Sequence, residues 1–114
     1  MTAYAIAHLH TPQVNPEVID YIERIQDTLD PFGGRFLVHG AEVVVKEGPF
    51  PGTVVVVEFP DVESAEQWYA SDGYQAILPL RTSNIDGTAI IVDGVPEGYD
   101  PRATAASLAR MADL

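Results

Sequence analysis

Residues 53–59 read TVVVVEF, with four consecutive valines ahead of a Glu-Phe pair. The run is too short for a helix and rich in β-branched residues, so it predicts a buried central strand. Successive side chains of a strand point to opposite faces, so either Val54 and Val56 or Val55 and Val57 lie on a given face. Whichever pair faces away from the core must meet an apolar partner.

The chain before this strand predicts a strand, a helix and a bent strand. Residues 2–10 (TAYAIAHLH) alternate in the manner of a strand, and an Asn-Pro pair begins a helix over about residues 16–30. The apolar stripe expected on that helix consists of Val18, Ile22, Ile25 and Leu29. Glycines end the helix, and residues 35–39 (RFLVH) then predict a strand that resumes as residues 41–47 (AEVVVKE). We expect a bend or bulge at Gly40, between these two pieces.

The chain after residues 53–59 predicts a second helical region and a last strand. The helical region begins at Pro60-Asp61, breaks near Asp72-Gly73 and ends near Arg81, and TAIIV at 88–92 is the strand. The resulting order, βαββαβ, is typical of an α+β, ferredoxin-like antiparallel sheet with both helices on one face. In such a sheet the strands lie in the order 4-1-3-2, and one face stays bare. A large bare apolar face usually marks an interface, so we expect a homodimer.

Residues 95–114 are expected to lie outside this domain, which covers residues 1–94. They begin with a linker-like PEGYDP and continue as a short helix capped by Asp100. The weak apolar stripe of this helix consists of Ala105, Leu108, Met111 and Ala112. We expect the helix to dock on its own subunit or on the partner; the alternative is a lid or a recruitment peptide.

The length, cysteine content and charge of the chain limit the kinds of protein and partner that fit the sequence. The 114 residues suffice for one domain, and cysteine is absent, which fits a reducing compartment. Seventeen acidic against six basic residues give a formal charge of −11, which disfavours nucleic acid as a partner. The basic residues are scattered, and no apolar run approaches the roughly 18 to 20 residues that span a bilayer. We therefore expect an acidic, soluble, cytoplasmic protein with no membrane partner.

Several short motifs, in the same order, resemble one family. They are GGR at 33–35, EFP at 58–60, SDGYQ at 71–75, LPLR at 78–81 and VDG at 92–94. Together they make the chain from Tyr4 to Gly94 resemble the family called domain of unknown function 1330, which is similar to the dimeric α/β-barrel superfamily. The resemblance implies two ferredoxin-like sheets paired face to face around a central space. The superfamily includes cofactor-independent monooxygenases, isomerases and dismutase-type enzymes. The histidine at position 39 departs from the family pattern, so the resemblance implies no role for it.

Arg35 and Glu58 are expected to be neighbours on adjacent antiparallel strands, because one strand begins where the other ends. A salt bridge is the simpler interpretation. The alternative is that Arg35 holds a ligand carboxylate, since a guanidinium suits either partner.

The three histidines raise the question of a metal site. His8 and His10 share a strand face with Tyr4, and His39 is expected at the same end of the sheet, facing as Arg35 and Leu37 do. Two strand spacings, roughly 10 Å, would separate His39 from the other two, too far for ligands of one ion, so no metal is expected. One interpretation is that His8 or His39 faces the central cavity as a polar group that acts as a general base, with Tyr4 as a ligand-binding group. The alternative is that these histidines are satisfied by hydrogen bonds or face solvent.

Arg81 and Tyr74 are the remaining candidates for ligand binding, supported by the family resemblance at both positions. Arg81 would anchor an anion at the cavity mouth, with Tyr74 as a hydrogen-bonding wall. The alternative for Arg81 is to pair with the last carbonyl groups of its helix. Trp68 and Tyr69 are expected in the core or a dimer contact.

Two functions of different class remain open. One is an enzyme that acts without a cofactor on a small carbonyl or carboxylate compound. The other is a non-catalytic dimeric module that binds a small anionic ligand. The sequence contains no Ser/His/Asp signature and no phosphate-binding glycine loop.

Overall fold

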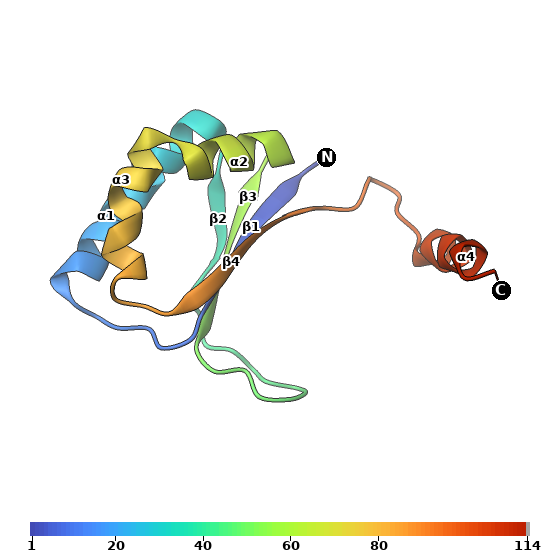
Figure 1. Cartoon of the computed structure of the whole chain (residues 1–114), viewed down its shortest axis with the longest axis horizontal. Coiled ribbons are helices and arrows are strands. Elements are labelled where there is room, and N and C mark those ends of the chain that lie inside the picture. The colour runs from blue at the N-terminus through green and yellow to red at the C-terminus, as the bar shows by residue number, and fades with distance from the viewer. Residues whose placement is uncertain (114) are drawn as a thin grey trace.

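The computed structural model describes residues 1–113 and confirms the ferredoxin-like fold. The strands are β1 (Ala3–Leu9), β2 (Arg35–His39), β3 (Thr53–Phe59) and β4 (Gly87–Asp93). The helices are α1 (Pro16–Leu29), α2 (Val62–Ala70), α3 (Asp72–Thr82) and α4 (Pro101–Met111), with a 3-10 turn, η1 (Asp30–Phe32), after α1. The antiparallel sheet has the order β2-β3-β1-β4, and α1, α2 and α3 lie on one of its faces (Figure 1).

The residues around the valine run decide which face is the core. Ala3 pairs with Phe59, and both are buried, as is Val57, so odd-numbered residues of β3 face the helices. Val54, Val56 and Glu58 therefore point to the opposite side, which we call the open face. The open-face side chains are Tyr4, Ile6 and His8 on β1, Val54, Val56 and Glu58 on β3, Thr88, Ile90 and Val92 on β4, and Arg35 and Val38 on β2.

A bulge in β2 changes the expected facing of its residues. Arg35 pairs with Glu58 and Val38 with Val56, so the register shifts around Leu37. The extra residue turns His39 to the helix side, where its ring stacks on Phe36 with centroids 4.4 Å apart. The prediction that Arg35 and His39 share a face is therefore wrong, and the irregularity lies before Gly40. Residues 41–47, expected as strand, form an irregular part of the β2–β3 connection.

The helices begin where the sequence places caps. Asn15 accepts a hydrogen bond from the Val18 amide at 2.9 Å, and Ser71 ends α2 and caps α3 through the Tyr74 amide. The buried stripe of α1 contains Tyr21 in place of the predicted Ile22, whose side chain is 47% exposed. The core therefore holds a phenol whose hydroxyl requires a partner.

The C-terminal helix stands apart from the rest of the chain. A linker leaves the end of β4 on the open-face side, and α4 lies beyond it (Figure 1). No α4 side chain is buried among the residues that the structure describes. Within residues 1–113, none of the helices is both long and apolar enough to cross a membrane.

Candidate ligand-binding pocket

The principal cavity lies between the sheet and the helices. Its volume of about 680 Å³ falls in the range of small-molecule sites. Most of its walls are apolar and come from α1 and from the helix-facing residues of β1, β3 and β4. Its polar lining includes Tyr21, Tyr74, Arg81 and His39. The expected cavity lay between two sheets, so this pocket is on the other side of the sheet from that prediction.

Helix α3 carries two of these polar groups on one face. Tyr74 and Arg81 are seven residues apart, close to two helical turns, and both are buried and line the pocket. Tyr21 approaches from α1, and the Tyr21 and Tyr74 hydroxyl oxygens are 2.7 Å apart. The Arg81 guanidinium carbon lies 5.8 Å from the centre of the Tyr21 ring. The structure thus brings together two predicted residues, Tyr74 and Arg81, with one that the sequence reasoning missed.

Arg81 is a buried cation. Its exposed fraction is 9%, and no carboxylate within residues 1–113 lies at salt-bridge distance from it. Burial lowers the pKa of its guanidinium, but interactions with the Tyr74 and Tyr21 hydroxyls outweigh burial and raise it. Arg81 therefore stays charged.

Tyr21 is held as a neutral phenol. Burial, and then the neighbouring Tyr74 hydroxyl, raise the pKa of Tyr21 far above its ordinary value. Tyr21 is therefore protonated throughout the physiological range and suits hydrogen bonding, not proton abstraction. The pocket lining thus includes a cation flanked by phenols, an arrangement that favours an incoming anionic or carbonyl oxygen.

His39 lines the same pocket from the end of β2. It is exposed, so it lies where the pocket meets solvent, and its ring packs against Phe36. Strand β2 and helix α3 both end at the same end of the sheet (Figure 1). Of the two histidines predicted as bases, this is the one that the structure places at the helix-side pocket.

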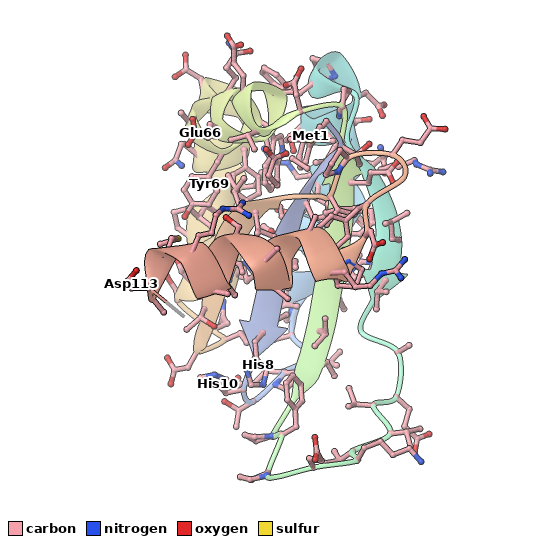
Figure 2. All side chains as sticks on the ribbon, turned by 90° about the vertical axis from the view of Figure 1, so that its right-hand side faces the viewer. Met1, His8, His10, Glu66, Tyr69 and Asp113 are labelled. Atoms are coloured by element: carbon pink, nitrogen blue, oxygen red, sulfur yellow. The ribbon has the colours of Figure 1, made fainter. Side chains whose placement is uncertain are left out.

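His8, Tyr4 and Arg35 lie on the open face and do not line this pocket. His8 stacks on Phe50 and donates from Nε2 to the Pro51 carbonyl oxygen at 2.6 Å, while His10 packs edge-on to it (Figure 2). Both His8 and His39 are at the same end of the sheet, as predicted, but on opposite faces. The predicted site residues therefore divide into two groups.

Arg35 forms the predicted salt bridge. Its Nε donates to Glu58 Oε1 at 2.8 Å, and the Arg35 side chain is 70% exposed. Hydrogen bonding to Glu58 raises the pKa of Arg35. The simpler of the two interpretations of Arg35 is thus present in the structure.

Trp68 lies in the core, as expected, and its indole N–H donates to Thr28 Oγ1 at 3.0 Å. Tyr69 borders the pocket beside it. Among residues 1–113, no three His, Asp or Glu side chains converge as metal ligands.

Comparisons with solved structures agree with the fold. A protein of unknown function from Rhodopseudomonas palustris is 15% identical, with a TM-score of 0.64 and 83% of each chain covered. A dimeric ferredoxin-like protein of unknown function from Jannaschia sp. CCS1 is 9% identical, with a TM-score of 0.57, 82% of this chain and 100% of that chain covered. SnoaB, a cofactor-independent oxygenase from Streptomyces nogalater, is 11% identical, with a TM-score of 0.52, 87% of this chain and 96% of that chain covered. At these identities the likeness shows the fold alone.

The family comparison is more specific than these structural likenesses. No curated protein matches the chain. Residues 2–95, however, match the family described as Domain of unknown function (DUF1330). That match covers most of the chain, and the predicted motifs lie within it. The chain therefore belongs to the DUF1330 family.

Proposed function

We propose that the helix-side pocket binds a small, largely apolar organic compound through a carboxylate or carbonyl oxygen. Arg81 carries this proposal, because a buried guanidinium with no carboxylate partner in residues 1–113 leaves positive charge facing an apolar cavity. Arg81 and Tyr74 would hold the ligand oxygen, and the apolar walls would hold the carbon skeleton.

We further propose that the chain is an enzyme that needs no cofactor. His39 would act as the general base at the rim, removing a proton from the carbon next to the ligand carbonyl group. The resulting enolate oxygen would be stabilised by Arg81 and the tyrosine hydroxyls. SnoaB, a protein of similar fold that is described as a cofactor-independent oxygenase, supports this proposal.

Calorimetry with 1-naphthoate tests the binding claim, with the uncharged 1-naphthalenemethanol as the matched compound. Arg81→Met should weaken naphthoate binding by about tenfold or more, since hydrogen bonds to charged groups contribute about 1.5–3 kcal/mol. Arg24→Met is the control, because Arg24 is exposed on α1 and pairs with Asp20. Equal affinity of the wild-type protein for the acid and the alcohol would contradict the proposal.

Deuterium exchange tests the catalytic claim. The probe is 4-phenyl-2-oxobutanoate in D₂O, with loss of the C3 proton signal followed by ¹H NMR. Wild-type protein should accelerate exchange, and His39→Gln should abolish the acceleration while binding is retained. His10→Gln is the control, since His10 lies outside the pocket.

The second candidate function is a non-catalytic binding module. It is favoured by one observation: no hydrogen bond fixes the His39 ring among the described residues, and the ring is exposed. Catalytic bases are usually oriented by a second group. Exchange at the background rate, together with Arg81-dependent naphthoate binding, would support this alternative.

We also propose that two copies pair through their open faces. Val38, Ile90 and Val92 are 38%, 56% and 42% exposed there, alongside Ile6 and the outward valines of β3. Covering these side chains removes apolar surface from water, at about 25 cal/mol per Å². Tyr4, His8 and Arg35 would face the space between the sheets, where a ligand-binding role for them stays a prediction. Sedimentation should give twice the 12.4 kDa chain mass; a stable monomer would contradict the pairing.

A further inference from the structure

Helix α4 extends the molecule well beyond the sheet and its helices. The Cα radius of gyration is 16.8 Å, whereas a compact chain of this length has about 13 Å. Figure 2 shows α4 running across the strand direction in front of the open face, and Figure 1 shows that it stands away from that face. Ile90 and Val92 remain substantially exposed beneath it, so α4 does not cover its own sheet.

This helix needs a surface to pack against. It has 11 residues, and isolated helices shorter than about 12–15 residues are marginal in water. Its apolar stripe is unpaired: Leu108 is 57% exposed and Met111 is 81% exposed. A helix with this pattern gains most of its stability from a docking partner.

The charge of α4 is opposite to that of the rest of the chain. Pro101–Met111 contains Arg102 and Arg110 and no acidic residue, although the whole chain carries −11. Arg102 already pairs with the capping Asp100 at 2.7 Å, so Arg110 is the α4 cation that forms no salt bridge within residues 1–113. Helix α1 carries four acidic residues against one arginine, and α2 carries two acidic residues and no basic one. The body of a second copy therefore offers α4 an acidic helical surface of complementary charge.

We propose that α4 is exchanged between subunits and packs on the body of a second copy of this chain. The linker after β4 leaves toward the open-face side, which is the side that the partner occupies in the proposed dimer (Figure 1). Each chain thereby holds its partner with the stripe of Leu108 and Met111, while Arg110 meets acidic side chains. The inference rests on the proposed pairing of the open faces.

Mixed dimers test the exchange directly, because the chain contains no cysteine and accepts a single spin label cleanly. Ser107→Cys protein without ¹⁵N enrichment, carrying a nitroxide at the new cysteine, is mixed with ¹⁵N-labelled wild-type protein. Only the wild-type amide signals are then observed, so any broadening by the nitroxide arises between chains. Ser107 is exposed on α4 and lies outside its apolar stripe. The control carries the nitroxide at Ala76→Cys, an exposed position on α3 outside the acidic surface of α1 and α2.

The expected result is strong broadening of amide signals within residues 2–94 of the ¹⁵N chain from the α4 label. The Ala76 label should leave those signals unchanged. A sample that sediments as a dimer but shows no broadening from the α4 label overturns the exchange while the paired sheets stand. A sample that sediments as a monomer overturns both.

A pair of substitutions gives an independent readout. Leu108→Asp combined with Met111→Asp should raise the dimer dissociation constant by about tenfold or more, because two apolar side chains lose their contact. Ser107→Asp is the control for added charge on α4 and should have a much smaller effect. An unchanged dissociation constant for the double variant overturns the exchange.

Discussion

Tyr21 on α1 and Tyr74 on α3 meet hydroxyl to hydroxyl, with 2.7 Å between the oxygens, next to the buried guanidinium of Arg81. This contact joins two helices that line the pocket. Tyr21→Phe removes one of its partners, and we expect the free energy of unfolding to fall by about 0.5–1.5 kcal/mol. Urea unfolding near pH 8 measures this loss, and an unchanged midpoint would mean that the contact does not stabilise the fold.

The buried phenol of Tyr21 should make the protein less stable at alkaline pH. Burial raises the pKa of Tyr21 above its ordinary value of 10.0, so above pH 10 the unfolded chain loses a proton that the folded chain keeps. The unfolded state then binds fewer protons, and stability falls as pH rises. Unfolding measured from about pH 8 to about pH 11 should show a steeper fall for the wild type than for Tyr21→Phe. Parallel curves would contradict the burial of a neutral phenol at this position.

Arg35 and Glu58 should be coupled in stability and irrelevant to the helix-side pocket. In a double-mutant cycle, the two alanine variants together should cost less than the sum of the single variants, because each removes the same pair. The exposed Asp20–Arg24 pair, with its longer 3.4 Å separation, is the control and should couple more weakly. Naphthoate binding should be unaffected in Arg35→Ala. Zero coupling together with lost binding would make Arg35 a ligand-binding residue.

Two glycines should respond to alanine in opposite ways. A Cβ at Gly34 would lie 2.8 Å from both Leu29 Cδ2 and Phe59 Cε1, so Gly34→Ala should destabilise the fold by about 1–3 kcal/mol. At Gly73, inside α3, the nearest atom is Thr28 Cγ2 at 3.9 Å, and Gly73→Ala should stabilise by about 0.5–1 kcal/mol. Thermal unfolding of both variants measures the contrast. Equal effects would contradict the tight packing around Gly34.

The sequence was sufficient to predict the element order and the sheet topology, because caps, glycines and apolar periods mark each element separately. The sequence left open which side chains of β3 face the helices, since valines occupy both the odd-numbered and the even-numbered positions from 54 to 57. Glu58 and Phe59 carry the missing signal: the polar residue marks the open face and the aromatic residue marks the core. The bulge around Leu37 is not marked by glycine, and for that reason His39 was placed on the wrong face.

The sequence predicted two polar residues of the pocket more readily than the side of the sheet on which the pocket lies. Tyr74 and Arg81 were identified, but their position relative to the sheet depends on how α3 packs against α1, which no local pattern encodes. Tyr21 was missed because Ile22 fitted the apolar stripe equally well. A tyrosine within an apolar helix stripe is itself a signal, since its buried hydroxyl must find a polar partner.

The four valines of β3 provide the most direct test of where the ligand binds. A ¹³C-methyl NMR titration with 1-naphthoate compares Val55 and Val57, which line the pocket, with Val54 and Val56, which face the opposite side. Binding in the helix-side pocket should give saturable shifts of the Val55 and Val57 methyl signals that disappear in Arg81→Met and persist in Arg24→Met. Shifts confined to Val54 and Val56 that survive Arg81→Met would place the ligand on the open face and contradict the proposed site.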